Sequence, residues 1–174
     1  MKKQMAYLKL PYTRIQAVDG KLIEKYLNEG NAEKARGVLE DVRIKWDPIT
    51  HTRGFGEAGC GLSHIRTLLS AKDRIEQGEA LDGPVLVLED DVEISQDLVK
   101  DLRVNVTWLN EKHPNWKLFV VGHCVHSIID QPAIDQVAEI DGAKCTHAYI
   151  LNGMKAIDEM LDTINVAKYP DPID

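Results

Sequence analysis

Several features that define other protein classes are missing from this sequence of 174 residues. No apolar stretch approaches the roughly 18 residues that span a bilayer, and no apolar signal-peptide core follows residues 1–5. The three cysteines are scattered and odd in number, which argues against a disulfide framework, and no closely spaced pair suggests a zinc site. We therefore expect a reducing compartment, a cytoplasmic location and no transmembrane segment.

Positive charge is also scarce. The chain has 21 Lys and Arg against 28 Asp and Glu, a formal charge of −7, and no run of five or six basic residues. Because a net-negative surface repels phosphate backbones, we expect no nucleic-acid partner. The length fits one domain, and no repeat or Pro/Gly/Ser-rich linker divides the chain, so we expect residues 1–174 to form a single domain.

The spacing of apolar residues predicts helices and strands in alternation. Helical spacing occurs over 22–42, with a break at 28–31, and over 60–76; further helices would follow the N-capping residues Ser95 and Asn152. Short apolar runs predict four strands, at 85–88, 117–121, 137–140 and 147–151. This alternation indicates an α/β sandwich around a largely parallel sheet.

Three acidic residues, Glu89, Asp90 and Asp91, directly follow the strand predicted at 85–88. Ligands of such sheets bind beyond the carboxyl ends of the strands. Three adjacent carboxylates repel one another, and a bound Mg²⁺ or Mn²⁺ would relieve the repulsion and neutralise a diphosphate. The alternative is a solvated turn whose acids cap the following helix, and the triplet alone does not decide between them.

Small residues and two polar side chains mark the segment 59–64, which reads Gly-Cys-Gly-Leu-Ser-His. We expect this segment to open the helix at 60–76, where a helix N-terminus can receive a phosphate and Ser63 and His64 can add hydrogen bonds. The alternative is that the small residues serve helix packing and that His64 is satisfied internally.

Taken together, these segments resemble glycosyltransferase family 25, which includes bacterial lipopolysaccharide galactosyltransferases and collagen galactosyltransferases. The matching segments are 17–20, 56–64, 87–92, 147–151 with Gly153 and Ala156, and 172–174. The combination of 56–64 with 87–92 is the most specific part. Compared with the family pattern, the chain begins after the opening strand and stops at Asp174, so we expect a domain truncated at both ends that lacks the first strand.

The resemblance implies a GT-A-like fold. It also implies metal-assisted transfer of a hexose, often galactose, from a UDP-sugar to a saccharide acceptor, with inversion of configuration at the anomeric carbon. It implies Mn²⁺, or Mg²⁺, on the donor diphosphate. The site residues that it suggests are Asp91, Glu89 and His147 as metal ligands, Glu89, Asp90, Ser63 and His64 in donor binding, and Asp174 as the general base.

Two other functions are weighed against this prediction. A non-catalytic, glycosyltransferase-like binding or scaffold domain is favoured by the missing opening strand. An unrelated Mg²⁺ phosphohydrolase that uses the acidic triplet has no supporting nucleophile or second acidic pair in the sequence. The retained triplet favours the glycosyltransferase.

Overall fold

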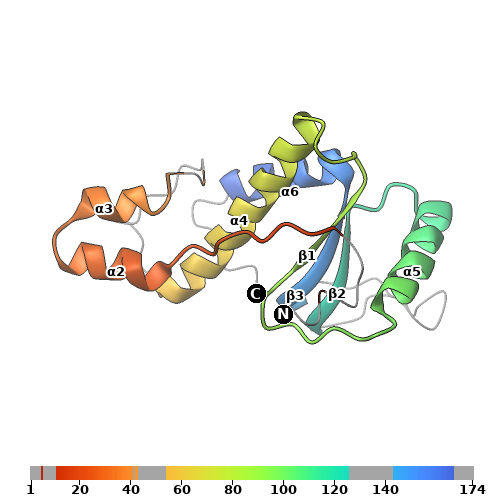
Figure 1. The fold of residues 1–174 in the computed structure, drawn as a ribbon, viewed down its shortest axis with the longest axis horizontal. Helices are drawn as coiled ribbons and strands as arrows, with labels where there is room; N and C mark the ends of the chain where they lie inside the picture. The colour runs from red at the N-terminus through yellow and green to blue at the C-terminus, as the bar shows by residue number, and fades with distance from the viewer. Residues whose placement is uncertain (1–4, 6–10, 41, 43–53, 126–142, 167–174) are drawn as a thin grey trace. The chain divides into compact units, whose positions relative to one another are not determined.

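The computed structural model describes Met5 and residues 11–40, 42, 54–125 and 143–166. Within them the elements follow in the order α2 (Gly20–Asn28), α3 (Ala32–Gly37), α4 (Phe55–Glu76), β1 (Pro84–Leu88), α5 (Leu98–Lys112), β2 (Leu118–Val125), β3 (Ala143–Asn152) and α6 (Gly153–Val166) (Figure 1). The chain divides into two compact units. The sheet unit includes Pro84–Gly153, and the helical unit includes Arg14–Gly83 and α6 from Met154 onward.

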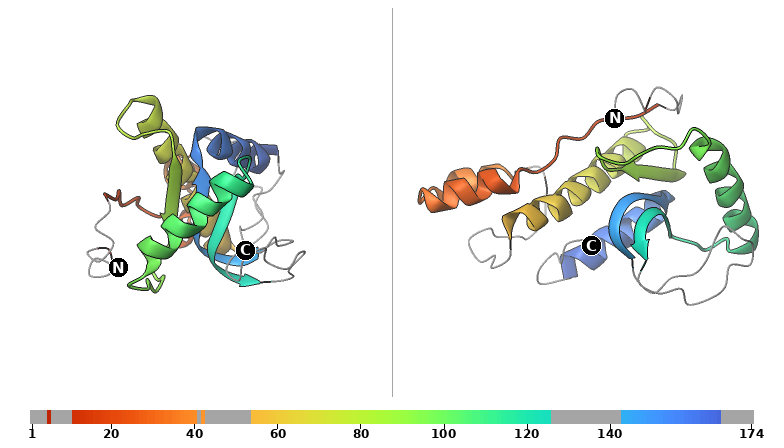
Figure 2. Two further views of the ribbon diagram at one scale, coloured as in Figure 1. Left: turned by 90° about the vertical axis from the view of Figure 1, so that its right-hand side faces the viewer. Right: turned by 90° about the horizontal axis from the view of Figure 1, so that it is seen from below.

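The described part of the sheet unit contains three strands in the order β1-β3-β2, with β3 in the centre (Figures 1 and 2). Both pairings are antiparallel. The prediction of a mixed α/β chain is thus confirmed, but the prediction of a largely parallel sheet is wrong for the described strands. The physical reason is that a continuous apolar run shows that a strand is buried, and says nothing about the direction of its neighbour.

The predicted strands at 85–88, 117–121 and 147–151 are all present, and the last two are longer than expected. β2 continues through Gly122, beyond the end predicted at residue 121, and its register against β3 shifts on both sides of this glycine. A glycine inside a strand often marks such a bulge rather than a strand end. The strand predicted at 137–140 lies outside the described residues.

The helical unit begins with the two short helices that the break at 28–31 predicts. Asp19 caps α2 and Asn31 caps α3, each with a side-chain oxygen that accepts from the backbone N–H three residues on, at 3.0 and 3.1 Å. Gly30 joins the helices with φ of +71°, a left-handed conformation that glycine adopts without strain. The sequence predicts this break because the turn and cap residues lie within a few positions of the groups that they contact.

The long helix α4 ends as predicted but begins earlier. It stops at Glu76, and Gly78 follows with φ of +72°. Its start is at Phe55, after Gly54, so the prediction that the helix begins at residue 60 is wrong. Leu62, Ile65 and Leu68, at helical spacing, are fully buried and form the apolar stripe.

The starts of α5 and α6 also differ from the prediction. Asp97, not Ser95, is the N-cap of α5, while the Ser95 hydroxyl accepts from the Asp97 N–H at 3.2 Å. In the first turn of α6, Asp82 Oδ1 accepts from the Met154 N–H at 2.7 Å. The side-chain amide of Asn152, expected to cap α6, donates to a carbonyl oxygen in the sheet unit at 3.1 Å. None of the described helices is long and apolar enough to cross a membrane.

Candidate active site

The acidic triplet lies at the carboxyl end of β1, where the sequence predicts it. Glu89 continues the strand pairing, since its N–H donates to the His147 carbonyl oxygen at 2.9 Å. Asp90 and Asp91 form the turn that follows. The alternative role as a helix cap is excluded for the described structure, because α5 begins only at Leu98 with Asp97 as its cap.

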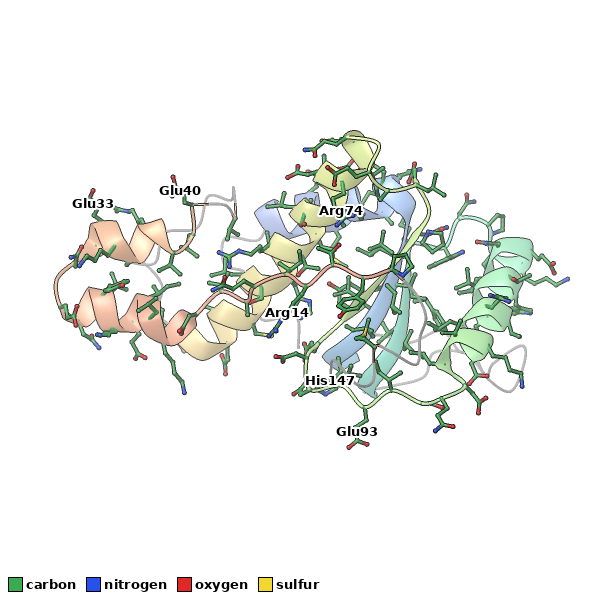
Figure 3. All side chains as sticks on the ribbon, viewed as in Figure 1. Arg14, Glu33, Glu40, Arg74, Glu93 and His147 are labelled. Atoms are coloured by element: carbon green, nitrogen blue, oxygen red, sulfur yellow. The ribbon has the colours of Figure 1, made fainter. Side chains whose placement is uncertain are left out.

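Antiparallel pairing brings His147 beside this triplet. Leu88 lies opposite Ala148, so the next pair along the two strands is Glu89 and His147. Glu89 Oε2 is 3.0 Å from His147 Nδ1, and Asp91 Oδ1 is 4.0 Å from the same nitrogen. Figure 3 labels His147 on the sheet. In a parallel sheet the beginning of the strand that carries His147 would lie at the opposite edge from Glu89. The direction of β3 therefore assembles the cluster.

The three side chains of this cluster become more exposed from the strand outward. The exposed fraction is 26% for Glu89, 44% for His147 and 74% for Asp91. The cluster is thus anchored in the sheet at Glu89 and open to solvent at Asp91, which suits a site that admits a ligand.

The donor set fits a divalent cation. One carboxylate oxygen each of Glu89 and Asp91 and one ring nitrogen of His147 lie within 4.8 Å of one another. Two ligands that each lie ~2.1 Å from one ion are at most ~4.2 Å apart, so small side-chain rotations would bring the atoms to ligand distance. Oxygen with imidazole nitrogen is a set that Mn²⁺ accepts, and the exposure of Asp91 leaves room for water or substrate.

The family comparison decides which class of protein carries this cluster. A model of glycosyltransferase family 25, described as lipopolysaccharide biosynthesis proteins, matches residues 1–171. The chain belongs to glycosyltransferase family 25. Searches of curated proteins and of solved structures gave no significant match. Membership of family 25 supports a transferase that acts between a sugar donor and an acceptor in lipopolysaccharide biosynthesis.

Ser63, predicted to bind the donor of this family 25 protein, makes its described hydrogen bonds within the helical unit. Its hydroxyl accepts from the Val18 N–H at 2.8 Å and donates to the Gly59 carbonyl at 2.6 Å. His64 is buried, with 5% of its surface exposed. Both lie inside α4, so the prediction that they open a helix is wrong and the phosphate argument from a helix N-terminus loses its basis. Their role in donor binding stays a prediction.

The glycines of the same segment serve a close approach between two pieces of chain. A Cβ atom at Gly59 would lie 2.9 Å from both the Val18 oxygen and the Gly20 nitrogen. A Cβ atom at Gly20 would lie 1.7 Å from the Phe55 oxygen. Two of the segments that resemble family 25, 17–20 and 56–64, therefore pack directly on each other. The sequence shows both glycines but not that they meet.

Two predicted site residues remain without structural support. Asp90 is exposed in the turn after β1, and its contact with the donor stays a prediction. Asp174, the predicted general base, lies outside the described residues. The resemblance names Glu89 and His147 as ligands of one cation, but it does not predict the direct contact of their side chains, because these residues are 58 positions apart and no local pattern links them.

Proposed function

We propose that this family 25 protein transfers a hexose, with galactose as the expected sugar, from a UDP-sugar to a hydroxyl group of a saccharide acceptor. The proposed scaffold is GT-A-like. The observation that carries the proposal is the meeting of Glu89, Asp91 and His147 at the end of β1. A cation held at that position can bind the diphosphate of a nucleotide sugar.

The residues of the cluster share one role in the proposal. Glu89, Asp91 and His147 would hold Mn²⁺ or Mg²⁺, each through one ligand atom of the cluster. A cation held by these residues would supply positive charge to neutralise the departing diphosphate. Asp90, the next side chain in the turn, contacts the ribose or sugar of the donor.

The charge of the segment after β1 supports a need for the cation. Glu89, Asp90, Asp91 and Glu93 lie within five residues and include no basic side chain. Such a segment repels a diphosphate unless positive charge is supplied. A donor that binds here without a metal would have to overcome this repulsion.

We propose that the transfer inverts the configuration at the anomeric carbon of the hexose, and the bond changes follow from this. The acceptor oxygen bonds to the anomeric carbon from the side opposite the diphosphate while the bond from that carbon to the diphosphate oxygen breaks. The electron pair of that bond leaves with UDP. The hydroxyl proton passes to a general base, for which Asp174 is our prediction.

The proposal is tested by thermal denaturation of the full chain with a set of UDP-sugars, in Mn²⁺ and in EDTA. A ligand at about 100 times its Kd stabilises the folded state by about 2.7 kcal/mol. We expect stabilisation by one UDP-hexose in Mn²⁺, with little effect in EDTA, and UDP release once an acceptor is added. An equal shift in EDTA would exclude metal-assisted binding, and no shift with any UDP-sugar would favour the scaffold alternative.

A further inference from the structure

A cysteine and a histidine of the helical unit lie one turn apart on α4. The Sγ atom of Cys60 and one ring nitrogen of His64 lie within 4.8 Å of each other. We propose that this pair binds a thiophilic divalent cation, Zn²⁺ or an ion of similar chemistry, through ligands that the cluster at the end of β1 does not use. The inference goes beyond the proposed function and does not depend on it.

The helix itself sets the spacing of the two ligands. Side chains at positions i and i+4 lie one above the other on the same helix face and point toward the helix N-terminus. Cys60 and His64 have this spacing inside α4, which runs from Phe55 to Glu76. Sulfur at ~2.3 Å and nitrogen at ~2.1 Å from one Zn²⁺ are at most ~4.4 Å apart, so a small rotation of the cysteine side chain brings the pair to ligand distance.

The two ligands differ in exposure in a way that suits an ion bound at the surface of the helix. His64 has 5% of its surface exposed, so packing fixes its ring, whereas Cys60 is exposed. Gly56 lies one turn before Cys60 on the same face, and a Cβ atom there would have nothing within 4 Å. This open space can hold the water molecules that complete a tetrahedral shell around the ion.

The sulfur atom decides which ions fit the pair. A thiolate selects Zn²⁺ over Mg²⁺ and Mn²⁺, which suit oxygen ligands, and imidazole suits Zn²⁺ as well. The Cys60 thiol must lose its proton when the ion binds, so the affinity should increase with pH and binding should release a proton. We therefore expect Zn²⁺ and Co²⁺ to bind to this pair and Mg²⁺ to leave it free.

Co²⁺ is the probe for the thiolate, because a cobalt–thiolate bond gives a charge-transfer absorption in the near ultraviolet that oxygen and nitrogen ligands do not give. We expect this band when Co²⁺ is added to the full chain, and its loss when Zn²⁺ displaces Co²⁺. Cys60→Ser changes an exposed position, so the protein should fold and lack the band. Its Zn²⁺ affinity should be lower by at least about tenfold, the loss caused by removing even a hydrogen-bond partner of a ligand.

His147→Asn is the matched control for Cys60→Ser, because it alters the cluster at the end of β1 and leaves the pair on α4 unchanged. It should keep the cobalt band. A band that survives in Cys60→Ser would show that another group binds the ion and would overturn the inference. A band that His147→Asn abolishes would also overturn it, because the thiolate would then depend on the other ligand set.

The histidine ligand is tested on the parent by nuclear magnetic resonance of the imidazole nitrogens. A ring nitrogen of His64 should shift when Zn²⁺ is added, and EDTA should reverse the shift. The same ring should not shift with Zn²⁺ in Cys60→Ser or with Mg²⁺ in the parent. An unchanged His64 signal in the parent would overturn the inference, while metal-assisted transfer would still stand on its own test with UDP-sugars.

Discussion

The sheet unit and the helical unit each carry a segment that resembles family 25, and the two segments use their polar groups differently. In the helical unit, the Ser63 hydroxyl bonds to the backbone at Val18 and Gly59. In the sheet unit, Glu89 and Asp91 approach the same imidazole nitrogen. The first arrangement satisfies backbone groups and so stabilises the fold. The second places two carboxylates beside one imidazole at an exposed strand end, a donor set that fits a divalent cation.

This difference predicts that substitutions in the two segments have separable effects. A change in the sheet-unit cluster should reduce activity with little effect on stability. A change at Gly59 or Ser63, in the segment 56–64, should reduce stability whether or not it affects activity. The predictions below test this separation.

The largest expected effect is that of Asp91→Asn on transfer. The variant keeps the shape of the side chain but removes a charged ligand, so activity should fall by about 100-fold or more, equivalent to roughly 3 kcal/mol. The melting temperature of the metal-free protein should stay the same or rise slightly, since one repulsive charge is removed. UDP release and metal-free thermal denaturation are measured in parallel.

Glu93→Gln is the control for Asp91→Asn, because Glu93 is exposed in the same acidic segment and labelled in Figure 3. It should leave both readouts near those of the parent. An Asp91→Asn protein that melts early but still binds donor and metal like the parent would show that Asp91 has a structural role.

A smaller effect, and one on stability, is expected for Gly59→Ala. The added methyl group would lie 2.9 Å from two backbone atoms of the segment 17–20, so the chain must shift. We expect the free energy of unfolding to fall by about 2–3 kcal/mol in urea denaturation. Gly56→Ala, on the same helix with nothing within 4 Å, should be neutral or more stable by up to ~1 kcal/mol. Equal effects of the two changes would argue against the close approach.

The next effect in size is that of Ser63→Ala, which removes the acceptor of the Val18 N–H. We expect the free energy of unfolding to fall by about 1–2 kcal/mol. Thr67→Ala is the control, since it loses one bond to a helix carbonyl and should cost little. The KM for the donor is measured as well. A raised KM with unchanged stability would support the donor-binding prediction for Ser63 against the structural role.

The smallest effect concerns the ion pair of Lys72 and Asp158, which joins α4 to α6. The hydrogen bond to Asp158 raises the pKa of Lys72 above its ordinary value, and nearby carboxylates add to the shift while burial opposes it. A raised folded-state pKa means that the pair stabilises the protein below the ordinary pKa near 10.5, and that this stability is lost as pH rises through the folded value.

The Lys72 prediction is checked with Asp158→Asn by urea denaturation across pH. The parent should be more stable than the variant by ~0.5 kcal/mol near neutral pH, since the pair is partly exposed, and the difference should shrink above pH ~10.5. The exposed pair of Lys25 and Glu29 provides a control, because Glu29→Gln should have little effect at any pH. A difference that grows with pH would contradict the prediction.

Local chemistry explains which features of the fold could be predicted. The break at 28–31 and the end of α4 before Gly78 depend on caps and turn residues that are close in the sequence. The start of α4 was missed because Gly54 and Gly56 look like loop residues. That part of the helix packs against Gly20, whose missing side chain admits the Phe55 oxygen.

The sequence by itself determined the family, the existence of the described strands and the place of the acidic triplet after β1, because each depends on residues that are adjacent in the chain. Only the tertiary structure decided that β3 runs antiparallel to β1, that His147 therefore meets Glu89, and that Ser63 bonds to Val18. These contacts join residues 58 and 45 positions apart. A run of apolar residues does not show in which direction a strand runs beside its neighbour. A serine hydroxyl does not show which backbone group it will bond to. Both are selected by the packing of the whole chain, which forms the site from residues that no local pattern connects.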